Sequence, residues 1–225
     1  MASGEIAECT LHSNLALACS TDQQTQTLAI HIDNHDKPFR ATDVPRNQSW
    51  VGGIRPWNLT ITGTVFASDL EMLLTHLPLP TIGHISVRGY DAAQFELAVL
   101  GRLVNLSSID LSDNRLNRIV TSTKCDPKKP LAPQRACSFP LGAQVRTLAL
   151  ANNDLTQVKP QFLGLFPHLQ TLDLSNNRLT NISSSLFQRT PALKVLKLKG
   201  NRLAHVRHST FAPLTQLQNL TLRTN

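Results

Sequence analysis

Apolar and polar positions follow a fixed frame along the second half of the chain. The frame reads Leu172-x-Leu174-x-x-Asn177-x-Leu179-x-x-Ile182 and returns as Leu196-x-Leu198-x-x-Asn201-x-Leu203-x-x-Val206. Its asparagine recurs at a constant interval, which we call the repeat length, at Asn153, Asn177, Asn201 and Asn225. Two leucines separated by one residue predict a short β-strand that presents both leucine side chains on one face.

This frame is the pattern of a leucine-rich repeat, so the sequence predicts an α/β-type solenoid. Each repeat supplies one strand to a curved parallel sheet on the concave face, and the inward leucines form a continuous core. An asparagine amide has both donors and an acceptor, so a column of asparagines can satisfy backbone groups that the fold buries. Phe162, Phe187 and Phe211 recur behind the strands and are expected to form an aromatic spine on the convex side.

The frame extends backwards with weaker matches. Tyr90 lies one repeat length before Asn114, and Thr64 lies slightly more than one repeat length before Tyr90. The seven expected strands lie near Leu59, Ile85, Ile109, Leu148, Leu172, Leu196 and Leu220.

The frame divides the chain into an N-terminal cap, residues 1–56, and about seven repeats, residues 57–225, of which the last is truncated. Within the cap, residues 15–19 and 28–32 alternate as short strands, which predicts a hairpin-like cover for the first repeat. A solenoid end without a capping segment exposes its core. We therefore expect the chain to be the N-terminal piece of a longer ectodomain.

One interval is longer than the others, because Asn114 and Asn153 are separated by well over one repeat length. The surplus is an insertion at about residues 121–143, whose prolines and charges exclude a buried strand. Insertions in solenoids often contact partners, and a tolerated surface loop explains the segment equally well.

Four cysteines form two closely spaced pairs, Cys9 with Cys19 and Cys125 with Cys137. The spacing favours two local disulfides, one in the cap and one at the base of the insertion, although four cysteines allow three connectivities. Metal binding is the alternative, but neither pair has the spacing or the companion histidines of zinc sites. Paired cysteines favour an oxidising, extracellular setting.

The sequence also contains N-glycosylation sequons at Asn47, Asn58, Asn105, Asn181 and Asn219. With the cysteines, they favour the extracellular side of a membrane. The sequence contains no apolar run of about 20 residues that would predict a membrane span, and the N-terminal segment lacks the apolar core of a signal peptide. We expect either a mature or engineered ectodomain fragment, which the cysteines and sequons favour, or a cytosolic protein.

Solvent-facing strand positions supply the candidate binding residues. The frame predicts a concave face that is acidic near Asp110, Asp113 and Asp173 and basic further along the chain, where Lys194, Lys197 and Lys199 are expected to share one face. The candidate ligand-binding residues are Asp110, Asp173, Lys194, Lys197, Lys199 and Arg223.

The basic region and the net charge of +7 suit an anionic partner, such as an acidic protein patch, a glycosaminoglycan or nucleic acid. A solvated basic face is the alternative. Aromatic residues for base stacking are absent from the nearby positions, which disfavours nucleic acid. The eight histidines are scattered, and none is expected beside a nucleophile. We therefore expect no enzyme activity, no metal and no cofactor.

The chain resembles the N-terminal ectodomain of Toll-family receptors, especially the long arthropod Tolls. The resemblance rests on Ile109-Asp-Leu-Ser-Asp-Asn-Arg-Leu116 followed by a cysteine-bearing insertion, on Leu148-Ala-Leu-Ala-Asn-Asn-Asp-Leu155, and on Leu220-Thr-Leu-Arg-Thr. It covers most of the chain after about Asn105. The cap departs from the family, because it has two cysteines where many leucine-rich caps have four.

The resemblance implies an innate-immune or developmental signalling receptor that binds a cytokine-like protein or another cell-surface receptor and dimerises. Its membrane span and its cytoplasmic domain would lie outside these 225 residues. A leucine-rich adhesion or guidance receptor is the main alternative. A secreted proteoglycan core and a cytosolic scaffold are further alternatives.

Overall fold

The computed structural model describes residues 6–8, 17–22, 24–32, 56–77, 81–120 and 140–223. Predictions about Cys9, Cys125, Cys137, Asn47 and Asn225 fall outside these ranges, and so does most of the insertion. Cys19 lies in a described strand, but its side chain is not described.

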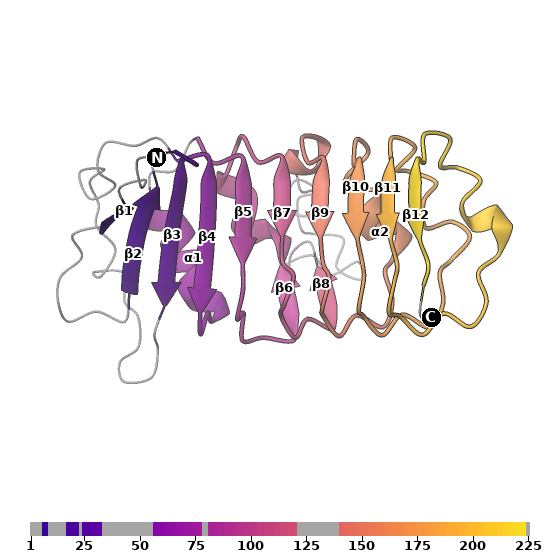
Figure 1. Ribbon diagram of the computed structural model, residues 1–225, viewed down its shortest axis with the longest axis horizontal. Helices are drawn as coiled ribbons and strands as arrows, with labels where there is room; N and C mark the ends of the chain where they lie inside the picture. Colours follow the sequence, from indigo (N-terminus) through magenta and orange to yellow (C-terminus); the bar gives the residue numbers. More distant parts are fainter. Residues whose placement is uncertain are drawn as a thin grey trace, which may run out of the picture.

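One sheet of ten strands runs the length of the molecule, in the order β1-β2-β3-β4-β5-β7-β9-β10-β11-β12 (Figure 1). The strands are β1 (Ile6–Glu8), β2 (Leu17–Asp22), β3 (Thr27–Ile32), β4 (Asn58–Gly63), β5 (His84–Val87), β7 (Ser108–Asp110), β9 (Thr147–Ala149), β10 (Thr171–Asp173), β11 (Val195–Lys197) and β12 (Asn219–Thr221).

The seven strands expected from the repeat frame are all present, and they pair in the register that the frame requires. From β4 to β12 every neighbouring pair is parallel. The first frame residues therefore form one row across the sheet: Leu59, Ile85, Ile109, Leu148, Leu172, Leu196 and Leu220. Since both frame leucines point inward, the strand residue between them faces outward. The sequence thus predicted both the strands and their pairing.

At the N-terminal end, β2 pairs antiparallel with both β1 and β3. β3 then pairs parallel with β4, so that Leu28 lies beside Leu59 and Ile30 beside Ile61. Leu28, Ile30 and Ile32 are buried like the frame residues of the repeats. β2 and β3 therefore form the expected antiparallel hairpin, and β3 also pairs with β4 in the way that the repeat strands pair with one another.

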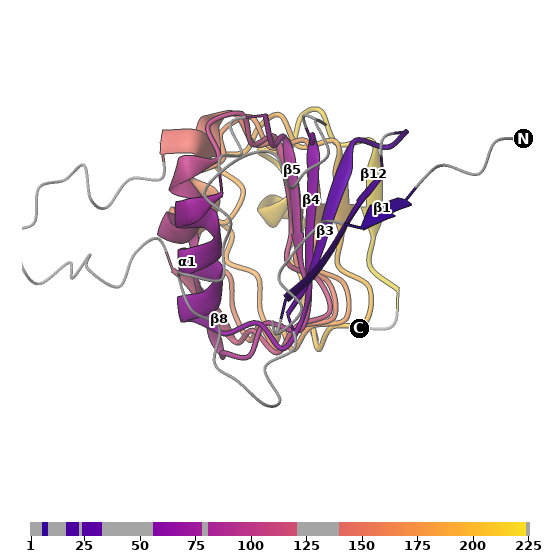
Figure 2. The same ribbon diagram turned by 90° about the vertical axis from the view of Figure 1, so that its left-hand side faces the viewer.

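Helical turns and short segments cover the inner face of the sheet (Figure 2). They include α1 (Ala67–His76), η3 (Leu97–Arg102), η5 (Pro140–Ala143), α2 (Pro160–Leu163) and η6 (His208–Thr210), with a small parallel sheet of β6 (Gln94–Glu96) and β8 (Arg118–Val120). The sequence analysis did not predict α1. It occupies the slightly long interval between Thr64 and Tyr90, and Leu70, Leu73, Leu74 and Leu77 bury the helix face that meets the sheet.

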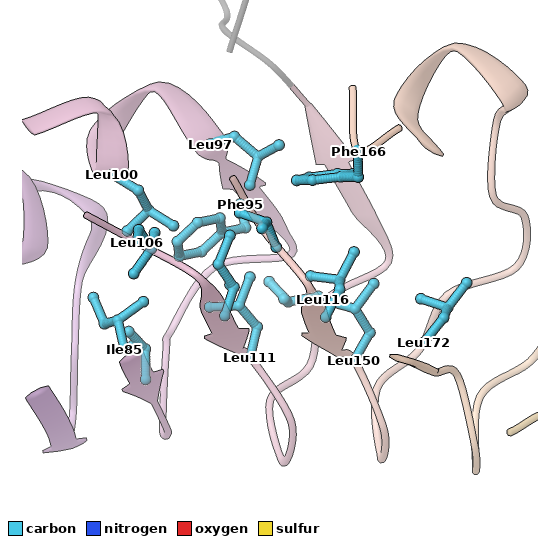
Figure 3. Packing of buried hydrophobic residues seen from close by; sticks show 14 of the residues in the cluster. Ile85, Phe95, Leu97, Leu100, Leu106, Leu111, Leu116, Leu150, Phe166 and Leu172 are labelled. Carbon is cyan, nitrogen blue, oxygen red and sulfur yellow. The ribbon is translucent and has the colours of Figure 1, made fainter. Parts of the chain in front are cut away.

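The core lies between these two layers. Figure 3 shows Phe95 among Leu97, Leu106 and Leu111, where the strands face the opposite segments. The predicted aromatic spine is only partly right. Phe187 is fully buried and stacks on Phe211 with ring centroids 6.0 Å apart.

Phe162, by contrast, is only partly buried. Its ring packs edge-on against Phe166, with ring centroids 5.4 Å apart. Phe166 is fully buried, and the sequence analysis had not included it. The repeat frame correctly predicted an aromatic residue in this layer, but the buried residue is Phe166 and not Phe162.

Candidate binding surface

The asparagines of the repeat frame organise the end of each strand. The Nδ2 of Asn177 donates to the carbonyls of Leu174 in its own repeat and Leu150 in the preceding repeat, at 3.1 and 2.8 Å. Its Oδ1 accepts from the Leu155 backbone N–H at 3.0 Å. Asn114, Asn153 and Asn201 make the same kinds of contact and are equally buried. The predicted role of the asparagine column is therefore confirmed.

The residue before each of these asparagines turns the chain through the left-handed backbone region. Positive φ angles recur in this row at Gly63, Gly89, Asp113, Asn152, Asn176 and Gly200. Glycine is required at Gly89, because a Cβ there would lie 2.0 Å from the carbonyl oxygen of Gly63. The exposed side chains of the row bond in series: Asn176 donates to Asn152, and Asn152 donates to Asp113, each at 2.7 Å.

The opposite edge of the sheet, where the strands begin, is equally regular. One carbonyl in each repeat accepts two backbone N–H groups from the next repeat. For Lys194 the donors are Gln218 and Asn219, at 2.8 and 3.0 Å. The carbonyls that do this belong to Trp57, Gly83, Ser107, Arg146, Gln170 and Lys194. These contacts hold the repeats at a fixed spacing.

Between these edges lies the outer surface of the sheet, opposite α1 (Figure 2), which we call the open face. It consists of three rows of side chains that alternate with the buried frame residues. The first row is Thr27, Asn58, His84, Ser108, Thr147, Thr171, Val195 and Asn219, and the second is Ala29, Thr60, Ser86, Asp110, Ala149, Asp173, Lys197 and Thr221. The third row follows two residues later at His31, Thr62, Arg88, Ser112, Ala151, Ser175, Lys199 and Arg223.

Charges on the open face are paired more than the sequence indicated. Arg88 lies 3.7 Å from the carboxylates of both Asp110 and Asp113. Lys197 Nζ lies 3.1 Å from Asp173 Oδ2, since these residues are directly opposite on β11 and β10. Arg88 thus offsets part of the negative charge of the expected acidic region, and the expected basic region contains an ion pair. The predicted acidic and basic regions therefore contain cross-strand ion pairs that the sequence analysis did not foresee.

The shared face predicted for Lys194, Lys197 and Lys199 was wrong. Lys194 precedes β11 and belongs to the row of residues at the strand starts. Side chains alternate along a strand, so Val195 is the residue in phase with Lys197 and Lys199. Of the six candidate ligand-binding residues, Asp110, Asp173, Lys197, Lys199 and Arg223 belong to the open face, and Lys194 lies at its edge.

His84 and Ser108 form a contact that the sequence analysis missed. His84 Nδ1 lies 2.8 Å from Ser108 Oγ, because the two residues are opposite each other on β5 and β7. Their separation by one repeat length was the signal that could have identified the pair. Burial lowers the pKa of His84, and the charge of Asp110 opposes this effect more weakly. This pair tests the expectation that no histidine lies beside a cysteine or serine in an arrangement that suggests a nucleophile.

This pair does not form a nucleophilic site. In a Ser-His-Asp arrangement the carboxylate orients the imidazole by a hydrogen bond. The carboxylate of Asp110 instead accepts from the Ser112 backbone N–H at 2.9 Å and from Ser86 Oγ at 3.4 Å, and it faces Arg88. Among the described residues, no group of three or more His, Cys, Asp or Glu side chains could hold a metal ion.

The described sequons differ in exposure. Asn105, Asn181 and Asn219 are exposed, whereas Asn58 is half-buried. The Asn58 amide donates to the Thr25 carbonyl at 2.8 Å. Asn219 and Asn58 both belong to the first row of the open face. In the part of the chain that the structure describes, no helix has the length and apolar character needed to cross a bilayer.

Comparisons with known proteins agree with this architecture. The sequence profile of the leucine-rich repeat family matches residues 143–184 and 167–225. No curated protein sequence matches the chain significantly.

The solved structures that are similar to the chain include the two described here. The TLR13 chain of a TLR13–ssRNA13 complex is 19% identical, with a TM-score of 0.57, over 86% of this chain and 29% of that chain. Human 5T4, also called Wnt-activated inhibitory factor 1 or trophoblast glycoprotein, is 22% identical, with a TM-score of 0.54, over 90% of this chain and 77% of that chain. The chain thus spans less than a third of the TLR13 chain, and both likenesses concern the fold.

Solenoids of this type are interaction scaffolds and typically not enzymes. The parallel strand register and the asparagine column show that the described residues fold as a leucine-rich repeat solenoid, and residues 143–225 match the leucine-rich repeat family.

Proposed function

We propose that the chain is part of the extracellular ligand-recognition region of a Toll-like signalling receptor, and that it binds a protein partner through the open face. The ligand is a cytokine-like protein or another cell-surface receptor, and binding leads to receptor dimerisation. A membrane span and a signalling domain are supplied by other parts of the receptor. The Toll-like repeats and insertion in the sequence support this proposal, as does the fold shared with TLR13.

The observation that carries the proposal is the composition of the open face. Its described rows hold hydroxyl, amide, small and charged side chains on a rigid parallel ladder, and the helical segments all lie on the other side (Figure 2). A wide polar surface of this kind is suited to a macromolecular partner.

The sequence disfavoured nucleic acid as a partner, and the comparison with TLR13 weakens that inference. The TLR13 neighbour was solved in a complex with ssRNA13, so this fold can accommodate RNA. Among the described residues, the three rows of the open face contain no aromatic side chain other than the imidazoles of His31 and His84. Stacking on aromatic residues contributes much of the affinity for single strands. A protein ligand therefore remains the proposal.

The extracellular setting is tested by producing the chain in the secretory pathway of animal cells. Glycosidase treatment is expected to lower its apparent mass, because sequons are available at Asn105, Asn181 and Asn219. Mass spectrometry without reduction is expected to find the disulfides Cys9–Cys19 and Cys125–Cys137. An unchanged mass together with four free thiols would contradict the extracellular assignment.

The full transcript that encodes the chain separates the proposal from its main alternative. A Toll-like receptor requires a membrane span followed by a cytoplasmic Toll/interleukin-receptor domain. An adhesion or guidance receptor lacks that domain and binds homophilically or to matrix. Beads coated with the chain test the second case, because homophilic adhesion would cluster them and the proposed function would leave them dispersed.

A further inference from the structure

At one place on the open face, positive charge is not balanced by the residues that the structure describes. Arg88 is close to Asp110 and Asp113, and Lys197 is close to Asp173. Within the described residues, Lys199 and Arg223 have no such partner, and both side chains are exposed. They lie in the third row of the open face at the β11–β12 end (Figure 1).

Lys199 and Arg223 are immediate neighbours on adjacent repeats. The Leu198 N–H donates to the Thr221 carbonyl at 2.8 Å, and the Gly200 N–H donates to the Arg223 carbonyl at 3.0 Å. Residues 199 and 223 are therefore opposite each other, at the spacing of about 4.8 Å that separates strands in a sheet. Like charges in directly opposite positions destabilise a sheet. A bound anion between them would remove that repulsion and gain two charge-assisted hydrogen bonds.

The nearest carboxylate on the open face, that of Asp173, does not balance the charges of Lys199 and Arg223. Asp173 is directly opposite Lys197, and its second oxygen accepts from the Ser175 backbone N–H at 3.0 Å. These contacts hold the Asp173 carboxylate on the β10 side of Lys197. Among the described residues, no other carboxylate is paired with Lys199 or Arg223, so an anion from another molecule can bind there.

The carboxylates of the open face limit how long a bound anion can be. A polyanion that ran across the repeats from β12 towards β7 would pass Asp173, Asp110 and Asp113, whose side chains are 18%, 20% and 45% exposed. Arg88 offsets only one of the two charges of Asp110 and Asp113, so the net negative charge there would repel successive phosphates or sulfates. A short acidic segment of a protein can place its carboxylates at the β11–β12 end alone.

We propose that Lys199 and Arg223, assisted by Lys197, bind a short Asp- or Glu-rich segment of a protein partner. The proposal deepens the proposed function, since it assigns the ligand chemistry of one part of the open face. Asp173 modulates the site, because it competes with the incoming carboxylate for Lys197.

The proposal is tested by fluorescence anisotropy with labelled hexaglutamate, with hexaglutamine as the uncharged control peptide. K199E/R223E is expected to weaken hexaglutamate binding at least tenfold. The matched control K159E/R207E makes the same change in net charge at exposed positions outside the open face and is expected to change binding less than twofold. K199Q/R223Q provides a second pair of substitutions if charge reversal impairs folding, and it is also expected to weaken binding.

A second pair of variants tests the role of Asp173. D173N frees Lys197 and is expected to strengthen hexaglutamate binding severalfold. D154N causes the same charge change where Asp154 pairs with Arg178, at 2.7 Å, and is expected to have little effect. Equal gains from both variants would indicate a general charge effect and would overturn the proposal.

Competing ligands complete the experiment. A short single-stranded RNA and a heparin oligosaccharide are titrated against the same variants. If either binds the wild type more tightly than hexaglutamate and is weakened by K199E/R223E, the site recognises polyanions and the acidic-segment proposal is wrong. Equal hexaglutamate affinity for wild type and K199E/R223E would overturn it too. The glycosidase, disulfide and transcript results do not depend on this outcome, so failure here leaves the proposed function separately testable.

Discussion

At the scale of single residues, two adjacent asparagines in the same repeat have different tasks. Asn177 is buried and bonds backbone groups of its own repeat and the preceding one. Asn176 is exposed, has φ of 54°, and bonds the side chain of Asn152. Sequence spacing identified the first as essential to the fold. The second task depends on a backbone conformation that the spacing does not reveal.

Replacement of Asn177 by leucine is expected to destabilise the protein by at least about 3 kcal/mol. The new side chain fits an apolar environment but leaves several buried backbone groups unpaired, at about 1–3 kcal/mol each. Asn176→Gly is the control, because glycine accepts the positive φ and only one exposed hydrogen bond is lost. Urea denaturation measures both. Similar losses for the two variants would contradict the assigned roles.

A buried hydroxyl gives a prediction of the opposite sign. Thr210 is 1% exposed, and its Oγ1 is buried without a hydrogen-bond partner within the described structure. The corresponding residue one repeat earlier is Leu186, which is also buried. Thr210→Val removes the unsatisfied hydroxyl and keeps the shape, so it is expected to stabilise the protein by about 1 kcal/mol. A lower melting temperature for this variant would show that the hydroxyl has a partner.

At the scale of elements, strands contribute more than backbone pairing, because they bring side chains of successive repeats into contact. The open-face pairs His84–Ser108 and Asp173–Lys197 both join directly opposite residues on neighbouring strands. Two residues that are separated by one repeat length therefore lie side by side on neighbouring strands. Once the repeat frame is known, such pairs can be identified from the sequence alone. Which of these neighbours bond is decided by side-chain orientation and burial.

The β5–β7 contact makes stability depend on pH. Burial lowers the pKa of His84 in the folded state below the ordinary value of 6.5. The unfolded chain therefore takes up a proton at a higher pH than the folded one. Stability from neutral His84 is present above about pH 6.5 and is lost as the pH falls through the folded pKa.

Denaturation of wild type and His84→Gln at pH 8, 7, 6 and 5 measures this contribution. Glutamine keeps a polar side chain next to Ser108 and does not titrate. The advantage of the wild type over the variant is expected to shrink as the pH falls from 7 to 5. A constant difference between the two stability profiles would contradict the inference.

At the scale of the whole molecule, equivalent leucines of different repeats contribute differently to stability, depending on their place in the solenoid. Leu172 in the middle of the sheet is 0% exposed, whereas Leu220 on the last described strand is 38% exposed. Repeats in a solenoid are stabilised by their nearest neighbours, so burial depends on how many repeats flank a position.

Leu172→Ala is therefore expected to cost about 2–5 kcal/mol, and Leu220→Ala about 1 kcal/mol or less. Equilibrium denaturation measures the total effect, and hydrogen exchange at β10 and β12 locates it. Equal costs would show that Leu220 is covered in solution by a segment or partner.

The sequence by itself determined the solenoid, the seven repeat strands, their register and the role of the asparagines. These features repeat with a fixed period and concern contacts between equivalent positions, so a one-dimensional pattern contains them. The helix α1, the buried Phe166 and the contacts of Arg88 with Asp110 and Asp113 were decided only by the tertiary structure. Each depends on how a particular side chain meets a different residue on a neighbouring repeat, and the period carries no information about those unequal neighbours.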